Sequence, residues 1–150
     1  MEVILAEHAG FCFGVQRAVD TVYQQIENSE KKGRPIYTFG PIIHNEEVVS
    51  DLQRRGVRVL DSLAAAGRVS EEERGTVIIR SHGVEKIVCE NLKELGFEVV
   101  DATCPFVKRI HNIVEKESAA GKSIVIVGNE GHPEVEGIRG WSESATYIVG

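Results

Sequence analysis

Short runs rich in β-branched residues alternate with amphipathic stretches along most of this 150-residue chain. Runs that predict strands cover residues 2–6, 35–39, 57–60, 76–80, 97–100, 123–127 and 145–149, and most of them are almost wholly apolar. Helical periodicity covers 14–27, 45–55, 84–95 and 105–120, and a shorter helix is expected after Pro133. This alternation predicts an α/β fold in which parallel sheets are joined by crossover helices, with strands covered on both faces.

Composition and charge exclude several classes of protein. With 42% hydrophobic and 27% charged residues, the chain is expected to fold rather than to remain disordered. Its apolar runs are strand-sized, and Glu7 and His8 interrupt the first residues before a signal-peptide core could form, so we expect a cytoplasmic protein and no membrane association. A net charge of -6 repels polyanions, so we expect no nucleic-acid partner.

The cysteines and histidines indicate a weak internal repeat. Cys12 and Cys104 lie 92 residues apart (104 minus 12), and each stands between a predicted strand and a predicted helix. His44 and His132 occupy strand-to-helix turns farther along the same two units. Cys89 lies within an amphipathic stretch, which is typical of helix packing. A repeat of this length would place the next cysteine near ~196, beyond the end of the chain.

His82 follows another predicted strand, so several reactive side chains stand at strand ends. In open parallel sheets, ligands bind beyond the carboxyl ends of the strands, where helix N-termini also gather. We therefore expect one shared site. Its predicted members are Cys12, His44, His82, Cys104 and His132.

The residue types narrow the chemistry of this site without choosing one ligand. Thiolates without a C-x-x-C pair could bind an iron-sulfur cluster, a zinc ion or nothing. Imidazoles near helix starts suit an anion such as a diphosphate. Glu134 could donate a proton, although a glutamate in a first helical turn usually complements the helix dipole. Arg80 and the following SHG make a polar strand end, and Gly83 permits close approach of the backbone to a ligand.

Five segments together resemble one known family. They are, in order along the chain, GFCFGV, HNEEVV, SHGV, DATCP and GHPEVEG. In this order they resemble the 4-hydroxy-3-methylbut-2-enyl diphosphate reductases, which catalyse the last step of the non-mevalonate isoprenoid pathway. The resemblance implies a 4Fe-4S cluster held by three cysteines at the centre of three similar α/β lobes related by a pseudo-threefold axis.

The same resemblance assigns roles to residues of this chain. It implies that Cys12 and Cys104 are cluster ligands and that Glu134 supplies a proton. It implies reductive dehydroxylation of an allylic diphosphate to isopentenyl and dimethylallyl diphosphate, with ferredoxin or flavodoxin as the electron donor. The residues that it places around the substrate diphosphate are His44, His82 and His132.

The resemblance also predicts a division of the chain. Residues 1–101 would form the first lobe and residues 102–150 the beginning of the second, with the third lobe and the third cluster cysteine absent. Two thiolates in place of three predict weak cluster retention and no activity of this piece alone.

Two other functions remain open from the sequence. One is a non-catalytic α/β module that binds an anion or serves as a subunit of an assembly. The other is a zinc hydrolase in which Cys12, Cys104 and a histidine hold the metal and Glu134 acts as the base.

Overall fold

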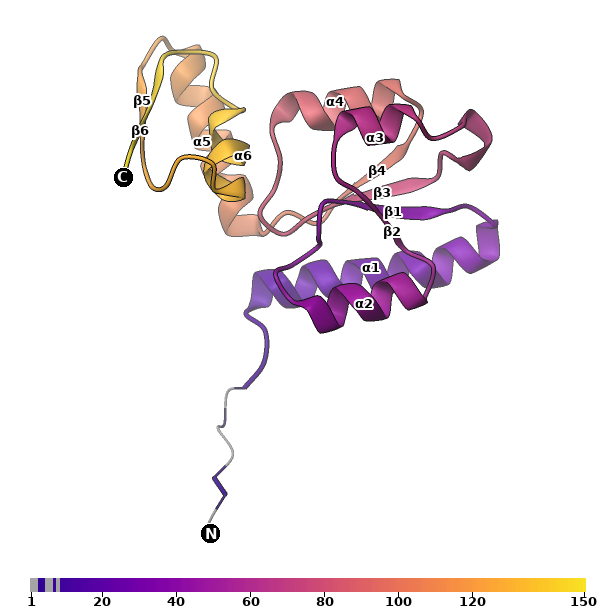
Figure 1. Ribbon diagram of the computed structural model, residues 1–150. Coiled ribbons are helices and arrows are strands. Elements are labelled where there is room, and N and C mark those ends of the chain that lie inside the picture. Colours follow the sequence, from indigo (N-terminus) through magenta and orange to yellow (C-terminus); the bar gives the residue numbers. More distant parts are fainter. Residues whose placement is uncertain (1–2, 5–6, 8) are drawn as a thin grey trace.

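The computed structural model, which describes residues 3–4, 7 and 9–150, contains two parallel sheets (Figure 1). The larger sheet has the strand order β2-β1-β3-β4, and the smaller sheet pairs β5 with β6. The strands are β1 (Ile36–Phe39), β2 (Arg58–Leu60), β3 (Thr76–Ile79), β4 (Glu98–Asp101), β5 (Ile124–Val127) and β6 (Thr146–Val149). The predicted α/β fold with parallel sheets is confirmed.

Helices connect the strands as crossovers. They are α1 (Phe13–Lys32), α2 (Glu46–Arg54), α3 (Leu63–Gly67), α4 (Lys86–Glu94), α5 (Pro105–Ala119) and α6 (Pro133–Arg139), with one 3-10 turn at Glu71–Glu73. In the larger sheet, α1 and α2 cover one face while α3 and α4 cover the other (Figure 1). The helix α1 extends to Lys32 and ends at Gly33, whose φ of 64° is the left-handed conformation that glycine adopts without strain.

The larger sheet is buried on both faces because successive strand residues point in opposite directions. All of β3 is buried, and its Ile78 packs with the α1 and α2 side of the core while Val77 and Ile79 pack with the α3 and α4 side. Leu92 from α4 is fully buried on this second side. This sheet therefore gives the turns beyond its strand ends a rigid base.

The smaller sheet is covered on one face. Its inward residues are half-buried and contact α5, whereas Val125, Val127, Tyr147 and Val149 are each more than half exposed. The expectation that strands are covered on both faces is therefore wrong for β5 and β6 in this chain.

The first predicted strand, at residues 2–6, lies mostly outside the described residues. Val3 and Ile4, the two described residues within it, are exposed and belong to no strand. In the described part of the chain, no helix combines the length and the apolar character needed to cross a bilayer.

Candidate functional site

Two cysteines stand at the N-termini of the longest helices. Cys12 is the residue before α1, and Cys104 is the residue before α5. Neither helix has an acidic side chain in its first turn, so the unsatisfied N–H groups and the positive end of the helix dipole are not offset there. The thiolate is the form of cysteine that binds metals.

Close packing brings these two helix starts together. A Cβ added to Gly14, two residues after Cys12, would overlap the Sγ atom of Cys104 and stand 3.0 Å from its Cβ. The guanidinium of Arg17, one turn farther along α1, donates a 3.0 Å hydrogen bond to the carbonyl of Thr103. The Cys104 thiol therefore lies in a space that exists because residue 14 has no side chain.

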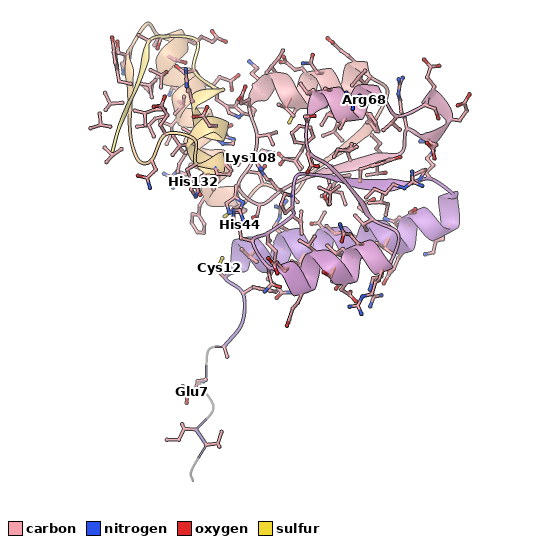
Figure 2. All side chains as sticks on the ribbon, in the orientation of Figure 1. Glu7, Cys12, His44, Arg68, Lys108 and His132 are labelled. Atoms are coloured by element: carbon pink, nitrogen blue, oxygen red, sulfur yellow. The ribbon has the colours of Figure 1, made fainter. Side chains whose placement is uncertain are left out.

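Three histidines come together from three separate turns. His44 lies between β1 and α2, His82 between β3 and α4, and His132 between β5 and α6. The ring centroids of His44 and His82 are 4.8 Å apart, and those of His82 and His132 are 6.5 Å apart. Figure 2 shows Cys12, His44 and His132 close together, where α5 and α6 approach the part of the fold that holds the larger sheet.

His132 also caps the helix that carries Glu134. Its Nδ1 accepts a 3.2 Å hydrogen bond from the Glu134 backbone N–H, and Pro133 occupies the first helical position. A neutral imidazole with an accepting Nδ1 carries its proton on Nε2, so the outer nitrogen is a donor. The cap thus fixes both the ring and the direction in which it offers a hydrogen bond.

The surroundings of His82 disfavour its protonated form. Burial lowers the pKa of His82, and the neighbouring His44 lowers it further, while the carboxylate of Glu134 acts in the opposite direction. The charges of Arg80 and His132 make smaller contributions, and both also lower the His82 pKa. Among the groups that act on His82, the Glu134 carboxylate is thus the one that favours its protonation.

The turn that carries His82 is held by both parts of the fold. The Cys104 N–H donates to the Ser81 carbonyl over 2.9 Å, and the Trp141 Nε1 donates to the Val84 carbonyl over 2.9 Å. The Trp141 ring stacks on His111, with centroids 5.1 Å apart and planes 17° apart. His111 is buried beside Gly83, where a Cβ would stand 3.3 Å from its Nε2 and closer still to its Cε1.

Sequence reasoning missed the roles of Arg17 and His111. Both lie within amphipathic helices, and the groups that they contact, the Thr103 carbonyl and the Trp141 ring, belong to distant parts of the chain. The one signal for His111 was its place four residues after Val107, on the buried side of α5.

The third cysteine does not join this site. Cys89 lies in α4, half-buried against the core, and burial raises the pKa of its thiol. Across the described ranges, no group of three or more His, Cys, Asp or Glu residues is placed to hold a metal ion. Of the described cysteines, Cys12 and Cys104 therefore stand at the two neighbouring helix starts and Cys89 does not.

Two cysteines at helix starts, with three imidazoles clustered beyond the ends of parallel strands, define an α/β protein whose reactive side chains gather at strand ends. Comparison with known proteins agrees with this class. Residues 3–150 match the LytB protein family, and the chain belongs to that family.

Two curated relatives of this chain share the same description. The chain is 48% identical over 149 residues to the 4-hydroxy-3-methylbut-2-enyl diphosphate reductase of Thermoanaerobacter sp. strain X514, covering 99% of this chain and 50% of the relative. It is 46% identical over 150 residues to the protein of the same description from Geobacter sulfurreducens, again covering 50% of the relative. The chain thus spans about half the length of the curated relatives it matches.

Solved structures show the same relation. The E-1-hydroxy-2-methyl-but-2-enyl-4-diphosphate reductase from Plasmodium falciparum superposes with a TM-score of 0.83 at 29% identity, covering 95% of this chain and 42% of that one. A second solved structure, an (E)-4-hydroxy-3-methyl-but-2-enyl diphosphate reductase, gives a TM-score of 0.78 at 40% identity, covering 99% and 50%.

Proposed function

We propose that this chain supplies the Cys12, Cys104 and histidine elements of a 4-hydroxy-3-methylbut-2-enyl diphosphate reductase. The observation that carries the proposal is the packing of Cys104 against Gly14, which joins two cysteine-bearing helix starts beside a cluster of three histidines. Family membership and the description of the curated relatives support the same reaction.

The donor set fits a 4Fe-4S cluster as two of its three thiolate ligands. Cys12 and Cys104 would bind it as thiolates, each from the residue directly before a helix. When bound, the cluster supplies electrons and one iron without a protein ligand, which can interact with the allylic hydroxyl group of the substrate. Because this chain brings two thiolates rather than three, we expect it to retain a cluster weakly and to show no turnover alone.

The histidines would hold the diphosphate. His132 offers Nε2–H as a donor. The ring of His82 lies next to that of His132, and the ring centroids of His44 and His82 are 4.8 Å apart. An allylic diphosphate bound there would place its negative charge against these imidazoles and fix the position of its hydroxymethyl end.

Glu134 would act as a proton donor in this arrangement. The overall reaction breaks one C–O bond, consumes two electrons and two protons, and releases water. Glu134 is half-buried next to His82, from where its carboxyl group would supply the proton that leaves with the oxygen. The second proton adds to the allylic carbon at either end, which gives the two isomeric products. Ferredoxin or flavodoxin would deliver the electrons.

Anaerobic reconstitution tests this function. The purified chain is incubated with iron, sulfide and a small external thiol that can occupy the third ligand position, and bound iron, bound sulfide and the visible absorption are measured. We expect about four irons per chain, the cluster's own composition, with the external thiol and fewer without it. Cys12→Ser and Cys104→Ser are each expected to lose the bound iron.

Cys89→Ser is the matched control, because this thiol lies in α4 away from the site. It should bind as much iron as the unchanged chain. Equal iron binding by all three variants would refute the proposed ligands. A stoichiometric, air-stable zinc ion without visible absorption would favour the hydrolase, and pyrophosphate binding without any metal would favour a non-catalytic anion-binding module.

A further inference from the structure

Arg80 is a half-buried cation whose charge acts on His82. It is the residue directly after β3 and lies two positions before His82. In the ranges that the structure describes, no carboxylate forms an ion pair with it, whereas the exposed arginines Arg54, Arg55 and Arg58 all have such partners. Removing a guanidinium from water without a countercharge is costly, so its retention here calls for an explanation.

The Arg80 side chain spans the two turns that carry His82 and His44. Its Nε donates a 3.2 Å hydrogen bond to the Gly83 carbonyl. Its NH1 reaches Gly40, where a Cβ would stand 3.0 Å away, and Gly40 itself has a φ of 68°. Residue 40 is thus a glycine for two reasons, its backbone conformation and the passage of this guanidinium.

Part of the guanidinium remains available for a ligand. Arg80 has five N–H donors, and within the described part of the chain only its Nε has a hydrogen-bond partner. The amino groups, which a planar guanidinium can offer as a pair to phosphate oxygens, have none. Burial lowers the pKa of Arg80, and in the described part of the chain no side-chain carboxylate is paired with it to oppose that effect.

We propose that Arg80 is an anion-binding residue of this site, whose guanidinium supplies the permanent positive charge that pairs with the substrate's diphosphate. His82 alone is a poor counterion, since burial and the neighbouring His44 lower its pKa. A guanidinium keeps its charge at any physiological pH. Arg80 then provides the positive charge, and the imidazoles provide hydrogen bonds of fixed direction.

This inference rests on the proposed function only in that both require a diphosphate at the histidines. The probe is inorganic pyrophosphate, titrated into the purified chain by calorimetry. Arg80→Gln should weaken its binding about 10- to 100-fold, the usual effect of losing one charge-assisted hydrogen bond. Arg80→Lys keeps the charge but loses the paired donors, so it should recover part of the affinity.

Arg68→Gln is the control of equal charge change. Arg68 is exposed at the end of α3, and Figure 2 shows it far from His44 and His132. It should bind pyrophosphate as the unchanged chain does. Far-UV circular dichroism and thermal unfolding establish that each variant is folded before affinities are compared.

A ligand-free measurement separates charge from packing. In an NMR titration of the imidazole signals, Arg80→Gln should raise the pKa of His82, because a neighbouring positive charge is removed, while Arg80→Lys should leave it nearly unchanged. Equal His82 pKa values in the two variants would show that the Arg80 charge does not act on the histidines, and the inference would be wrong.

The outcomes also distinguish the two proposals. If the unchanged chain binds pyrophosphate and His82→Asn weakens that binding but Arg80→Gln does not, the inference about Arg80 is wrong and the diphosphate site stands. If the unchanged chain binds no pyrophosphate, the inference about Arg80 is wrong, and the proposed cysteine ligands are decided by the iron measurement alone.

Discussion

Replacing Gly14 by alanine tests whether the two cysteines share one site. The new methyl group would stand 3.0 Å from the Cβ of Cys104 and overlap its Sγ. Non-bonded carbon atoms pack about 3.5–4.0 Å apart. Either α1 or the Cys104 side chain must therefore move by about 1 Å. Movement of this kind in a packed region costs about 1–3 kcal/mol.

Helix propensity acts in the opposite direction. Alanine in place of glycine stabilises a helix interior by about 1 kcal/mol, and less near an end. We therefore expect Gly14→Ala to lower the free energy of unfolding by about 0–2 kcal/mol. Gly67→Ala is the matched control, because Gly67 is also helical and a Cβ there meets no atom within 4 Å. It should leave stability unchanged or raise it by up to about 1 kcal/mol.

Urea-induced unfolding in a reducing buffer measures both variants, with the slope of the transition checked for constancy. A double-mutant cycle with Cys104→Ala sharpens the test, since removing the Sγ relieves most of the overlap. If Gly14→Ala is as favourable as Gly67→Ala, and Cys104→Ala does not change its effect, Cys104 does not lie against Gly14. The argument for a shared cysteine site would then fail.

Three further changes probe the elements around the site. Asn45→Ala should lower the free energy of unfolding by about 0.5–2 kcal/mol, because the Asn45 side chain accepts a 3.0 Å hydrogen bond from the Val48 N–H and caps α2; Asn45→Asp should restore it, and equal values in urea titrations would contradict the cap. Leu92→Ala should cost about 2–5 kcal/mol at a fully buried position, and a loss below 1 kcal/mol in the same assay would show that the core there is loosely packed. Burial lowers the pKa of His111 below 6.5, so the unfolded chain binds a proton that the folded chain resists, and stability should fall as pH drops below about 6.5. His111→Gln should make that fall shallower by up to about 1.4 kcal/mol per pH unit, and an unchanged slope in unfolding experiments between pH 7.5 and 5 would refute it.

The strands β1 and β3 of the larger sheet were predictable because most of their residues are apolar and pack into the core. β-Branched side chains buried on both faces give continuous apolar runs, and the predicted bounds of β1 and β3 each differ from the observed ones by a single residue at one end. The end of α1 was not predictable in this way. Residues 27–32 are polar and carry no apolar period, yet the helix continues through them until Gly33 permits a left-handed turn.

The sequence predicted which turns carry the site residues, but it did not predict the contacts that hold those turns in place. Parallel strands end at one edge, so residues after β1 and β3 were expected to be neighbours, and the contact of His44 with His82 reflects that rule. Which side chains support those turns depends on packing between α5, α6 and the turn after β3. The stack of His111 on Trp141 and the space at Gly14 arise from contacts between distant segments, and no local pattern encodes them. The catalytic and binding roles stay predictions.

The order of elements around the cysteines accounts for the unequal support of the site. After Cys12 come α1, β1, α2 and β2, and after Cys104 come α5, β5, α6 and β6, with a histidine before α2 and before α6. In the first unit, β1 has a partner strand on each side, whereas within the described residues β5 pairs with β6 alone. A two-stranded sheet is marginally stable without further packing. The residues His132 and Glu134 therefore depend on contacts across the junction, such as the Trp141 hydrogen bond to Val84 and the approach of Gly137 to the backbone of Gly83, for the position that His44 and His82 receive from the larger sheet itself.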